Sequence, residues 1–260
     1  MQDSVYNGLF AALTQEFRLN IISNNLANLN TVGFKREKLS FKDVFLHYAH
    51  DLADPNIGIR GGVIWPEADV LTQPRICESK IIFDQGPAKA TGNPLDLYIE
   101  GKGVFFKINT PGGIFYTRDG QFKLNDQGIL VNNDGFEVMG IGGPIQIPVG
   151  TKKIVINEKG EVYADGNLVG QLDLVTFSDL SKLIKVGANL FKVKQGANLQ
   201  EIPARNIRVL QGFLEGSNVN PVKEMVEMIE VLRSFEAAQK VMSSTNEEDR
   251  NLINKLGTST

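Results

Sequence analysis

Apolar residues at both ends of the chain recur at the spacing of an α-helix. Between residues 3 and 29 they fall on two interleaved series that together form one broad apolar face. These series are Val5, Leu9, Ala12, Leu19 and Leu26, and Tyr6, Phe10, Leu13, Phe17 and Ile21. A second helical pattern begins at Asn220-Pro221, with Asn in the N-cap position and Pro first in the helix, and extends to about position 256. The sequence therefore predicts one long helix at each end.

The middle of the chain changes to a period of two from Cys77 onward. Short apolar runs alternate with turn residues, and no helical spacing separates the runs, which argues against a parallel sheet. Asp-Gly pairs, which supply the positive φ angles of a tight hairpin, occur at Asp119-Gly120, Asp134-Gly135 and Asp165-Gly166. The predicted fold class is α+β, with long terminal helices packed as a coiled coil and a central, irregular, antiparallel all-β domain.

Two smaller patterns refine the β region. The run 125–131 resembles the run 157–163, and both are typical of a strand-turn-strand unit. Gly101-Lys102-Gly103 and Gly140-Ile141-Gly142-Gly143 are similar to phosphate-binding loops, but strand-like residues follow each of them. Because a phosphate loop needs the N-terminus of a helix, we interpret both as hairpin turns.

Glycine and proline divide the chain into segments. Of the 26 Gly and 10 Pro, most lie between about positions 55 and 215, while both ends contain few. Gly33 stands where the first helix should stop in a left-handed conformation. The predicted segments are an N-terminal helix (1–33), an extended connecting arm (34–75), the central β domain (76–205), an extended return segment (206–219) and a C-terminal helix (220–260).

The formal net charge of −3 argues against a nucleic-acid partner, because such proteins usually carry a basic domain or stripe. No apolar run reaches the roughly 18 residues that a membrane span requires. The first residues lack the basic and apolar regions of a secretory signal, which predicts the absence of a cleaved signal peptide. A single cysteine, Cys77, excludes an internal disulfide framework.

Candidate catalytic and metal-binding residues are few. His47 and His50 are three residues apart with Asp51 and Asp54 nearby, a spacing that a metal site could use on one helix face, but we interpret these residues as part of a polar arm. Cys77 has no histidine in a catalytic context. The carboxylates Asp119, Asp126, Asp134 and Asp165 lie mostly in turn dipeptides, where Asp has a conformational role. We therefore predict no enzymatic activity, no metal and no cofactor.

The polar content of the helices indicates assembly instead. Four Asn residues fall within seven positions at 24–30, although Asn is a mediocre helix former, and uncharged side chains with donors and acceptors suit a helix packed among others. Capping of the helix end by its own side chains, and ordinary intramolecular packing, are the alternatives. The predicted assembly interface is Val5, Leu9, Leu13, Phe17, Ile21, Asn24, Asn25, Leu26, Asn28, Phe34, Asn218, Asn220, Met225, Ile229, Leu232, Phe235 and Met242.

Four stretches in this order also match a known family. They are 22–28 with Thr31-Val32-Gly33-Phe34-Lys35, then 92–106, then Tyr116-Thr117-Arg118-Asp119-Gly120-Gln121-Phe122 with 128–135, and last 212–222. With these motifs the chain resembles the flagellar basal-body rod proteins, within the wider rod and hook axial family. The opening residues and the short central domain resemble the proximal-rod F-type more than the distal-rod G-type.

The resemblance implies a structural subunit. Such proteins leave the cytoplasm through the flagellar type III export apparatus and polymerise helically in the periplasm, with copies of themselves and other rod proteins, into the drive shaft. Their terminal helices pack as a coiled coil in the inner layer, with the β domain outside. From the residues alone, broad apolar faces on both helices predict a monomer that cannot cover them, and ends that order on assembly. A β-rich enzyme or binding module with helical appendages is the alternative.

Overall fold

The computed structural model describes residues 2–46, 71–187, 189–197, 199–204 and 207–257. It divides into two compact units. The first consists of Met1–Ser23, Leu39–Ser79 and Met225–Thr260, and the second of Asn24–Lys38 and Lys80–Glu224. The possible metal ligands His47, His50, Asp51 and Asp54 lie outside the described residues.

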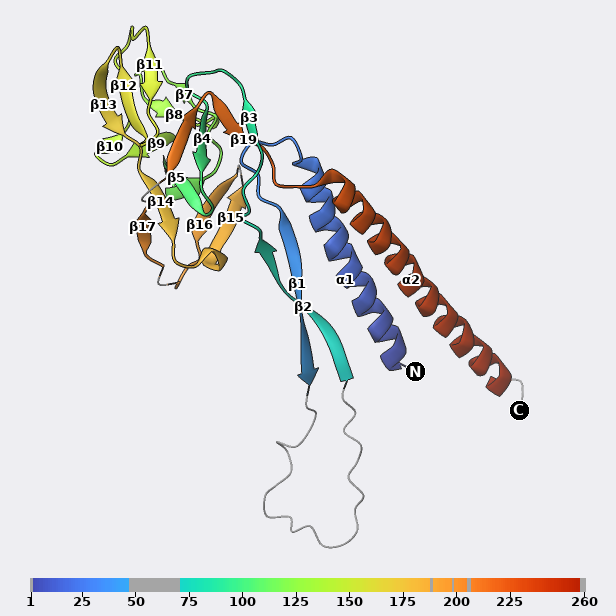
Figure 1. Ribbon diagram of the computed structural model, residues 1–260. Coiled ribbons are helices and arrows are strands. Elements are labelled where there is room, and N and C mark those ends of the chain that lie inside the picture. The colour runs from blue at the N-terminus through green and yellow to red at the C-terminus, as the bar shows by residue number, and fades with distance from the viewer. Residues whose placement is uncertain (1, 47–70, 188, 198, 205–206, 258–260) are drawn as a thin grey trace, which may run out of the picture. The chain divides into compact units, whose positions relative to one another are not determined.

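The two predicted terminal helices are confirmed as α1 (Gln2–Ala27) and α2 (Pro221–Gly257), coloured blue and red in Figure 1. Asn220 caps α2 as predicted, because its Oδ1 accepts a hydrogen bond from the Lys223 N–H at 3.1 Å. β1 (Glu37–Leu46) pairs with β2 (Leu71–Ile81), the strand that contains Cys77. Neither helix, over its described residues, is long and apolar enough to cross a bilayer.

The prediction that Gly33 stops the first helix is wrong. α1 already ends at Ala27, and a turn follows in which the Leu29 N–H bonds to the Leu26 carbonyl. Gly33 does have a positive φ of 68°, but for another reason. A Cβ placed there would lie 2.5 Å from the Arg118 carbonyl carbon, so this position needs glycine for close backbone contact with the β domain.

The second unit is built from short strands, joined in places by long loops. They are β3 (Ala88–Ala90), β4 (Leu97–Glu100), β5 (Val104–Thr110), β6 (Gly113–Thr117), β7 (Lys123–Leu124), β8 (Leu130–Val131), β9 (Glu137–Gly140), β10 (Gly143–Pro144), β11 (Ile154–Ile156), β12 (Glu161–Ala164), β13 (Asn167–Gln171), β14 (Leu174–Phe177), β15 (Leu183–Gly187), β16 (Leu190–Val193), β17 (Glu201–Pro203), β18 (Arg208–Gln211) and β19 (Phe213–Glu215). A short 3-10 helix, η1 (Leu180–Lys182), precedes β15.

The predicted antiparallel pairing is confirmed for these strands. The main sheet has the order β15-β16-β6-β5-β9-β8-β7, and β14 also pairs with β5. β11, β12 and β13 form a smaller sheet. The return segment is extended, as predicted: β18 pairs with β4, and β19 pairs with β3. The C-terminal end of the unit is thereby held to its beginning.

β5 positions two separate cores, because successive side chains on a strand point to opposite faces. Phe106 and Ile108 belong to a large aliphatic cluster together with Leu130 and Val138. Phe105 packs on the other face in an aromatic cluster that includes Phe177 and Phe191. There the ring centroids of Phe105 and Phe191 are 5.7 Å apart in an edge-on arrangement. All of these residues except Phe177 are at most 2% exposed.

The similarity between runs 125–131 and 157–163 has a physical basis. In each run an Asn side chain accepts hydrogen bonds from the backbone N–H groups two and four residues later, which closes an Asn-x-x-Gly loop: Asn125 binds Gln127 and Ile129, and Asn157 binds Lys159 and Glu161. A third copy, unnoticed in the sequence, uses Asn132 with Asp134 and Phe136. The same loop chemistry therefore recurs three times in the β unit.

The predicted glycine-containing turns are confirmed at three positions and wrong at two. The hairpin at Asp165-Gly166 is confirmed: both residues have positive φ, 48° and 89°, and the turn joins β12 to β13. Asp134-Gly135 also joins paired strands, and so does the loop between Gly140 and Gly143. The prediction of a hairpin at Asp119-Gly120 is wrong, because β6 and β7 do not pair with each other and Gly120 packs against the Leu97 carbonyl. The loop 101–103 is no hairpin either, since β4 pairs with β18.

Candidate assembly interface

Both helices expose bulky apolar side chains. On α1, Leu9 is 44% and Phe17 is 53% exposed, and on α2 Met225 is 53% exposed. We call this set the outer apolar face; it consists of Leu9, Phe10, Leu13, Phe17, Val222, Met225, Val226, Ile229, Leu232 and Val241. Six predicted interface residues belong to it: Leu9, Leu13, Phe17, Met225, Ile229 and Leu232. Exposed bulky apolar side chains that recur along a helix in this way usually mark an interaction site.

Other positions on each helix are less exposed. On α2 the less exposed positions include Glu224, Met228, Val231, Phe235, Ala238, Met242 and Thr245, a spacing of alternately four and three residues. On α1 they include Gly8, Ala12, Gln15, Leu19, Ile22 and Leu26, again at that spacing. The helices meet at Gly8, where an added Cβ would lie 2.6 Å from the Met242 Cγ. We call these positions the inner heptad face, since this is the repeat that a coiled coil requires.

The base of the β unit contains a buried ionic cluster. The Glu215 carboxylate accepts hydrogen bonds from Lys35 Nζ at 2.6 Å and from Arg118 Nε at 2.7 Å. Lys35 and Glu215 are each 1% exposed, and Arg118 is 3% exposed. Each charge comes from a different part of the chain: the segment after α1, the end of β6 and the end of β19. Buried charges require partners of this kind, because desolvation of an isolated ion is very unfavourable.

Backbone groups complete the coordination of this cluster. The Gly86 N–H donates to the Glu215 carboxylate at 2.8 Å, and the Lys35 ammonium donates to the Asp84 carbonyl at 2.7 Å. Arg118 donates to the carbonyls of Val104 and Ile99. Every buried side-chain nitrogen and oxygen in the described part of the chain has a hydrogen-bond partner. The cluster therefore links both ends of the β unit through saturated hydrogen bonding.

Three predicted interface residues lie at this base and are occupied within the chain. The Asn25 side chain bonds to the Glu37 backbone and to the Glu224 carboxylate. Phe34 is 2% exposed, and the Lys185 ammonium lies 3.7 Å from its ring centroid. The Asn218 amide donates to the carbonyls of Ile82 and Asp84, and its oxygen accepts from the Arg36 N–H.

The remaining predicted residues occupy varied places. Asn28 caps the end of α1, because its amide donates to the Asn24 carbonyl and its oxygen accepts from the Thr31 hydroxyl. Asn220 caps α2, Asn24 is exposed, and Ile21 is partly exposed. Phe235 and Met242 lie on the inner heptad face, as does Leu26. The side chain of Val5 lies outside the described part of the structure.

The electrostatic environment of the base shifts several pKa values. Burial lowers the pKa of the Lys35 ammonium, and the Glu215 carboxylate opposes that shift. Burial also lowers the pKa of Lys185, against the attraction of Glu37. Next to Arg118, burial raises the pKa of Asp119 to about 6, while the hydrogen bond from the Gln121 N–H acts in the opposite direction. These shifts reflect desolvation, which disfavours the charged form of each group.

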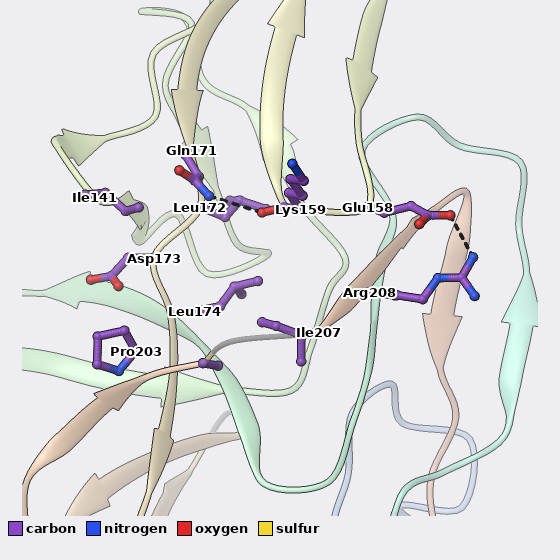
Figure 2. A pocket seen from close by; sticks show the side chains of 11 residues that line it. Ile141, Glu158, Lys159, Gln171, Leu172, Asp173, Leu174, Pro203, Ile207 and Arg208 are labelled. Carbon is purple, nitrogen blue, oxygen red and sulfur yellow. Dashed lines mark hydrogen bonds and ion pairs between the residues drawn. The ribbon is translucent and has the colours of Figure 1, made fainter.

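A surface hollow of about 730 Å³ lies between β13, β14 and β18 (Figure 2). Figure 2 shows Leu174 and Ile207 directed toward each other within it, with Asp173 nearby. At its edge the Arg208 guanidinium lies 2.6 Å from Glu158, as an exposed ion pair. Among its lining residues no nucleophile is paired with a base, so the hollow does not resemble a catalytic site.

The ionic cluster was missed from the sequence. Its members are present in the motifs listed above, as Gly33-Phe34-Lys35, Tyr116-Thr117-Arg118-Asp119-Gly120 and Gly212-Phe213-Leu214-Glu215-Gly216. The available signal was that each motif places a charge beside aromatic or aliphatic residues and glycine. Which charges pair could not be read from spacing, since Lys35 and Glu215 are separated by 180 positions.

An antiparallel β unit whose two ends are joined by an ionic cluster, flanked by long helices with exposed apolar faces, defines a class of assembly subunits. Three family models match successive parts of this chain: the flagella basal body rod protein (residues 6–35), the flagellar hook protein FlgE/F/G D1 domain (98–164) and the flagellar basal body rod FlgEFG protein C-terminal region (210–255).

Relatives match along nearly the whole length. The flagellar basal-body rod protein FlgF of Caulobacter vibrioides is 35% identical over 99% of each chain. FlgG of Bacillus subtilis is 33% identical over 98% of this chain and 99% of its own. FlgG of Buchnera aphidicola from Acyrthosiphon pisum is 36% identical over 90% of this chain and 92% of its own. The chain belongs to the flagellar basal-body rod protein family.

Proposed function

We propose that this chain is a structural subunit of the flagellar rod that polymerises helically through its terminal helices. The observation that carries the proposal is the outer apolar face, whose residues Leu9, Phe17 and Met225 are 44–53% exposed in the isolated chain. Burial of apolar surface yields roughly 25 cal/mol per Å², so neighbouring subunits gain free energy by covering this face. Head-to-tail contacts that do not close a ring produce a filament.

In this proposal the inner heptad face serves the chain itself. Alternating four- and three-residue spacing on both helices supports their packing as a coiled coil. The five segments then have separate tasks: the helices (1–33 and 220–260) form the axial contacts, the arm (34–75) and the return segment (206–219) connect, and the β domain (76–205) lies outside. The Asn residues at 24–30 lie where the helix end meets this connection.

Within the rod we favour the proximal part. The opening residues, the short β domain and the similarity to FlgF of Caulobacter vibrioides along 99% of the chain favour the proximal rod. A distal-rod subunit is the second candidate, favoured by the similarity to FlgG of Bacillus subtilis. In either place the partners are copies of this chain, other rod proteins and the export apparatus, and the location is the periplasmic basal body, reached without a cleaved signal peptide. The role is structural, with no nucleic-acid partner and no membrane insertion.

A charge on the outer apolar face tests the polymerisation. Phe17→Glu should abolish rod-like assemblies of the purified protein in electron micrographs, because ionised Glu is costly to bury. The matched control is Val149→Glu, at a β-unit position that is 83% exposed. Val149→Glu should assemble normally. Normal assembly of Phe17→Glu would refute the role of this face, and so would equal loss of assembly in both variants.

Deletion in the source bacterium separates the two rod positions. Basal bodies that lack all rod beyond the inner-membrane ring would support a proximal subunit, whereas a short residual rod would support a distal one. Removal of residues 1–30 should abolish assembly in both cases. Retained assembly by that truncated chain would favour a β module with helical appendages instead.

A further inference from the structure

A polar contact joins the two helices at the point where their inner heptad faces begin. The Asn25 amide donates to the Glu224 carboxylate at 3.1 Å, and both residues are 2% exposed. Glu224 lies in the first turn of α2, where the helix dipole stabilises a negative charge. Arg36 Nη1 lies 3.6 Å from the same carboxylate. We call Asn25, Arg36 and Glu224 the helix clasp.

Both amide protons of Asn25 and its side-chain oxygen form hydrogen bonds, and these bonds fix the position of the side chain. Its amide nitrogen also donates to the Glu37 carbonyl at 2.9 Å, and its oxygen accepts from the Glu37 N–H at 3.0 Å. The side chain therefore pairs with the Glu37 backbone as a strand partner would, while it binds α2 through its second amide proton. The end of α1, the start of β1 and the first turn of α2 meet at this one amide.

The rest of the inner heptad face is largely apolar, and apolar seams specify register weakly. Packing of residues such as Ala12, Ile22 and Val231 permits shifts by one heptad with limited loss of contact. A buried polar pair does not, because a shifted register breaks the hydrogen bond between Asn25 and Glu224 and leaves one buried amide proton unpaired, at a cost of about 1–3 kcal/mol. In coiled coils a single buried Asn sets register in this way.

A second contact lies at a matching distance along both helices. Gly8 contacts Met242. Gly8 precedes Asn25 by 17 residues on α1, and Met242 follows Glu224 by 18 residues on α2. At about 1.5 Å per residue both distances are about 26 Å, so antiparallel helices joined at the clasp bring these two residues level. Glycine at position 8 allows the close approach that this register requires.

From these contacts we infer that the helix clasp sets the register of α1 against α2. Asn25 and Glu224 are positioning residues: they align the inner heptad face and thereby determine which outer residues of the two helices form one continuous surface. The inference rests on the proposed function only for its consequence in assembly. The register itself is a property of the single chain.

Disulfide trapping in dilute monomer reads this register directly. In a Cys77→Ser background, Gly8→Cys with Met242→Cys should cross-link efficiently, because the two Cβ atoms lie within about 4 Å, the usual separation in a disulfide. Gly8→Cys with Phe235→Cys reports a shift by one heptad and should cross-link poorly. Absence of the first cross-link in the chain with an intact clasp would overturn the inference.

Asn25→Asp then removes the clasp with almost no change in shape. It replaces the donor with a second carboxylate facing Glu224, so the ratio of in-register to shifted cross-link should fall at least tenfold. Asn24→Asp is the matched control, because Asn24 is the exposed neighbour of Asn25, and the ratio should stay unchanged. Equal ratios in Asn25→Asp and Asn24→Asp would show that apolar packing alone sets the register.

A compensating change and an assembly measurement complete the test. Glu224→Gln in the Asn25→Asp background removes the repulsion and restores a donor, so the in-register cross-link should recover in part. Failure of the clasp and failure of the proposed function remain distinguishable. A chain that cross-links in register but never polymerises contradicts the rod proposal alone, whereas polymers built from either register contradict the positioning role.

Discussion

The Lys35 ammonium and the Glu215 carboxylate lie 2.6 Å apart, both 1% exposed, although 180 positions separate them in the chain. Lys35 follows α1 and Glu215 precedes α2, so this ion pair closes the β unit between the two helices. A buried pair of this kind contributes little net stability over apolar residues of similar volume. Loss of one partner, however, leaves an uncompensated buried charge.

We therefore predict that Glu215→Gln destabilises the protein by about 3–5 kcal/mol, because Lys35 and Arg118 both lose their counterion. The free energy of unfolding from urea titration, followed by circular dichroism, measures the effect. Glu158→Gln is the control, since its ion pair with Arg208 is exposed and should contribute little. A Glu215→Gln variant as stable as Glu158→Gln would mean that the cluster reorganises without loss.

Gly33 offers a second test of the same base. Gly33→Ala should destabilise by about 1–2 kcal/mol for its left-handed φ and by about 1–3 kcal/mol more for overlap with the Arg118–Asp119 peptide. Gly92→Ala is a matched control: its φ of 76° is similar, but nothing lies within 4 Å of its added Cβ. Thermal unfolding of the two variants should differ, with the lower Tm for Gly33→Ala. Equal Tm values would show that φ strain alone matters at position 33.

The three Asn-x-x-Gly loops lead to a prediction about turn chemistry. Asn125→Ala removes the acceptor of the Gln127 and Ile129 N–H groups and should destabilise by about 1–2 kcal/mol. Asn125→Asp keeps an oxygen in that place and should stay within about 0.5 kcal/mol of the unaltered chain. Urea unfolding of both variants compares them. Equal losses would mean that the amide nitrogen of Asn125, and not its oxygen, holds the loop.

The elements that could be predicted from the sequence depend on local rules. Helical period and an Asn-Pro start give α2, and Asp165-Gly166 gives a hairpin because its two residues alone satisfy the turn. Asp119-Gly120 is the same Asp-Gly dipeptide but does not form a hairpin turn. Its glycine is required by contact with Leu97 across the unit, and no local pattern reveals such a contact.

The exposure of several candidate interface residues was also predictable from helical period, while the interface itself stays a prediction. A broad apolar face identifies Leu9, Phe17 and Met225 as unsatisfied in a single helix, and they are exposed in the chain. The sequence could not tell which part of each face turns inward, because both parts have helical period. Asn25 and Phe34 look like surface contacts in the sequence, yet their partners Glu224 and Lys185 are remote and cover them within the chain.

Asp119 leads to a prediction about pH. Its pKa is raised from the ordinary value of 3.8 to about 6, so its contribution to stability is fully present below pH 3.8 and is lost as the pH rises through about 6. Asp119→Asn keeps an oxygen for the Gln121 N–H but cannot ionise. Because the side chain is partly exposed, we expect a screened gain for this variant of about 1–2 kcal/mol at pH 8, and no gain near pH 4.

Urea unfolding of Asp119→Asn and of the unaltered chain, each at pH 8 and pH 4, measures that difference. Val149→Ala, at a position that is 83% exposed, should show the same small offset at both pH values. A gain for Asp119→Asn that is equally large at pH 4 would trace the effect to the added amide and not to ionisation. A loss at pH 8 would show that the Asp119 carboxylate is stabilised in its charged form, for instance by the neighbouring Arg118, and that burial does not dominate its titration.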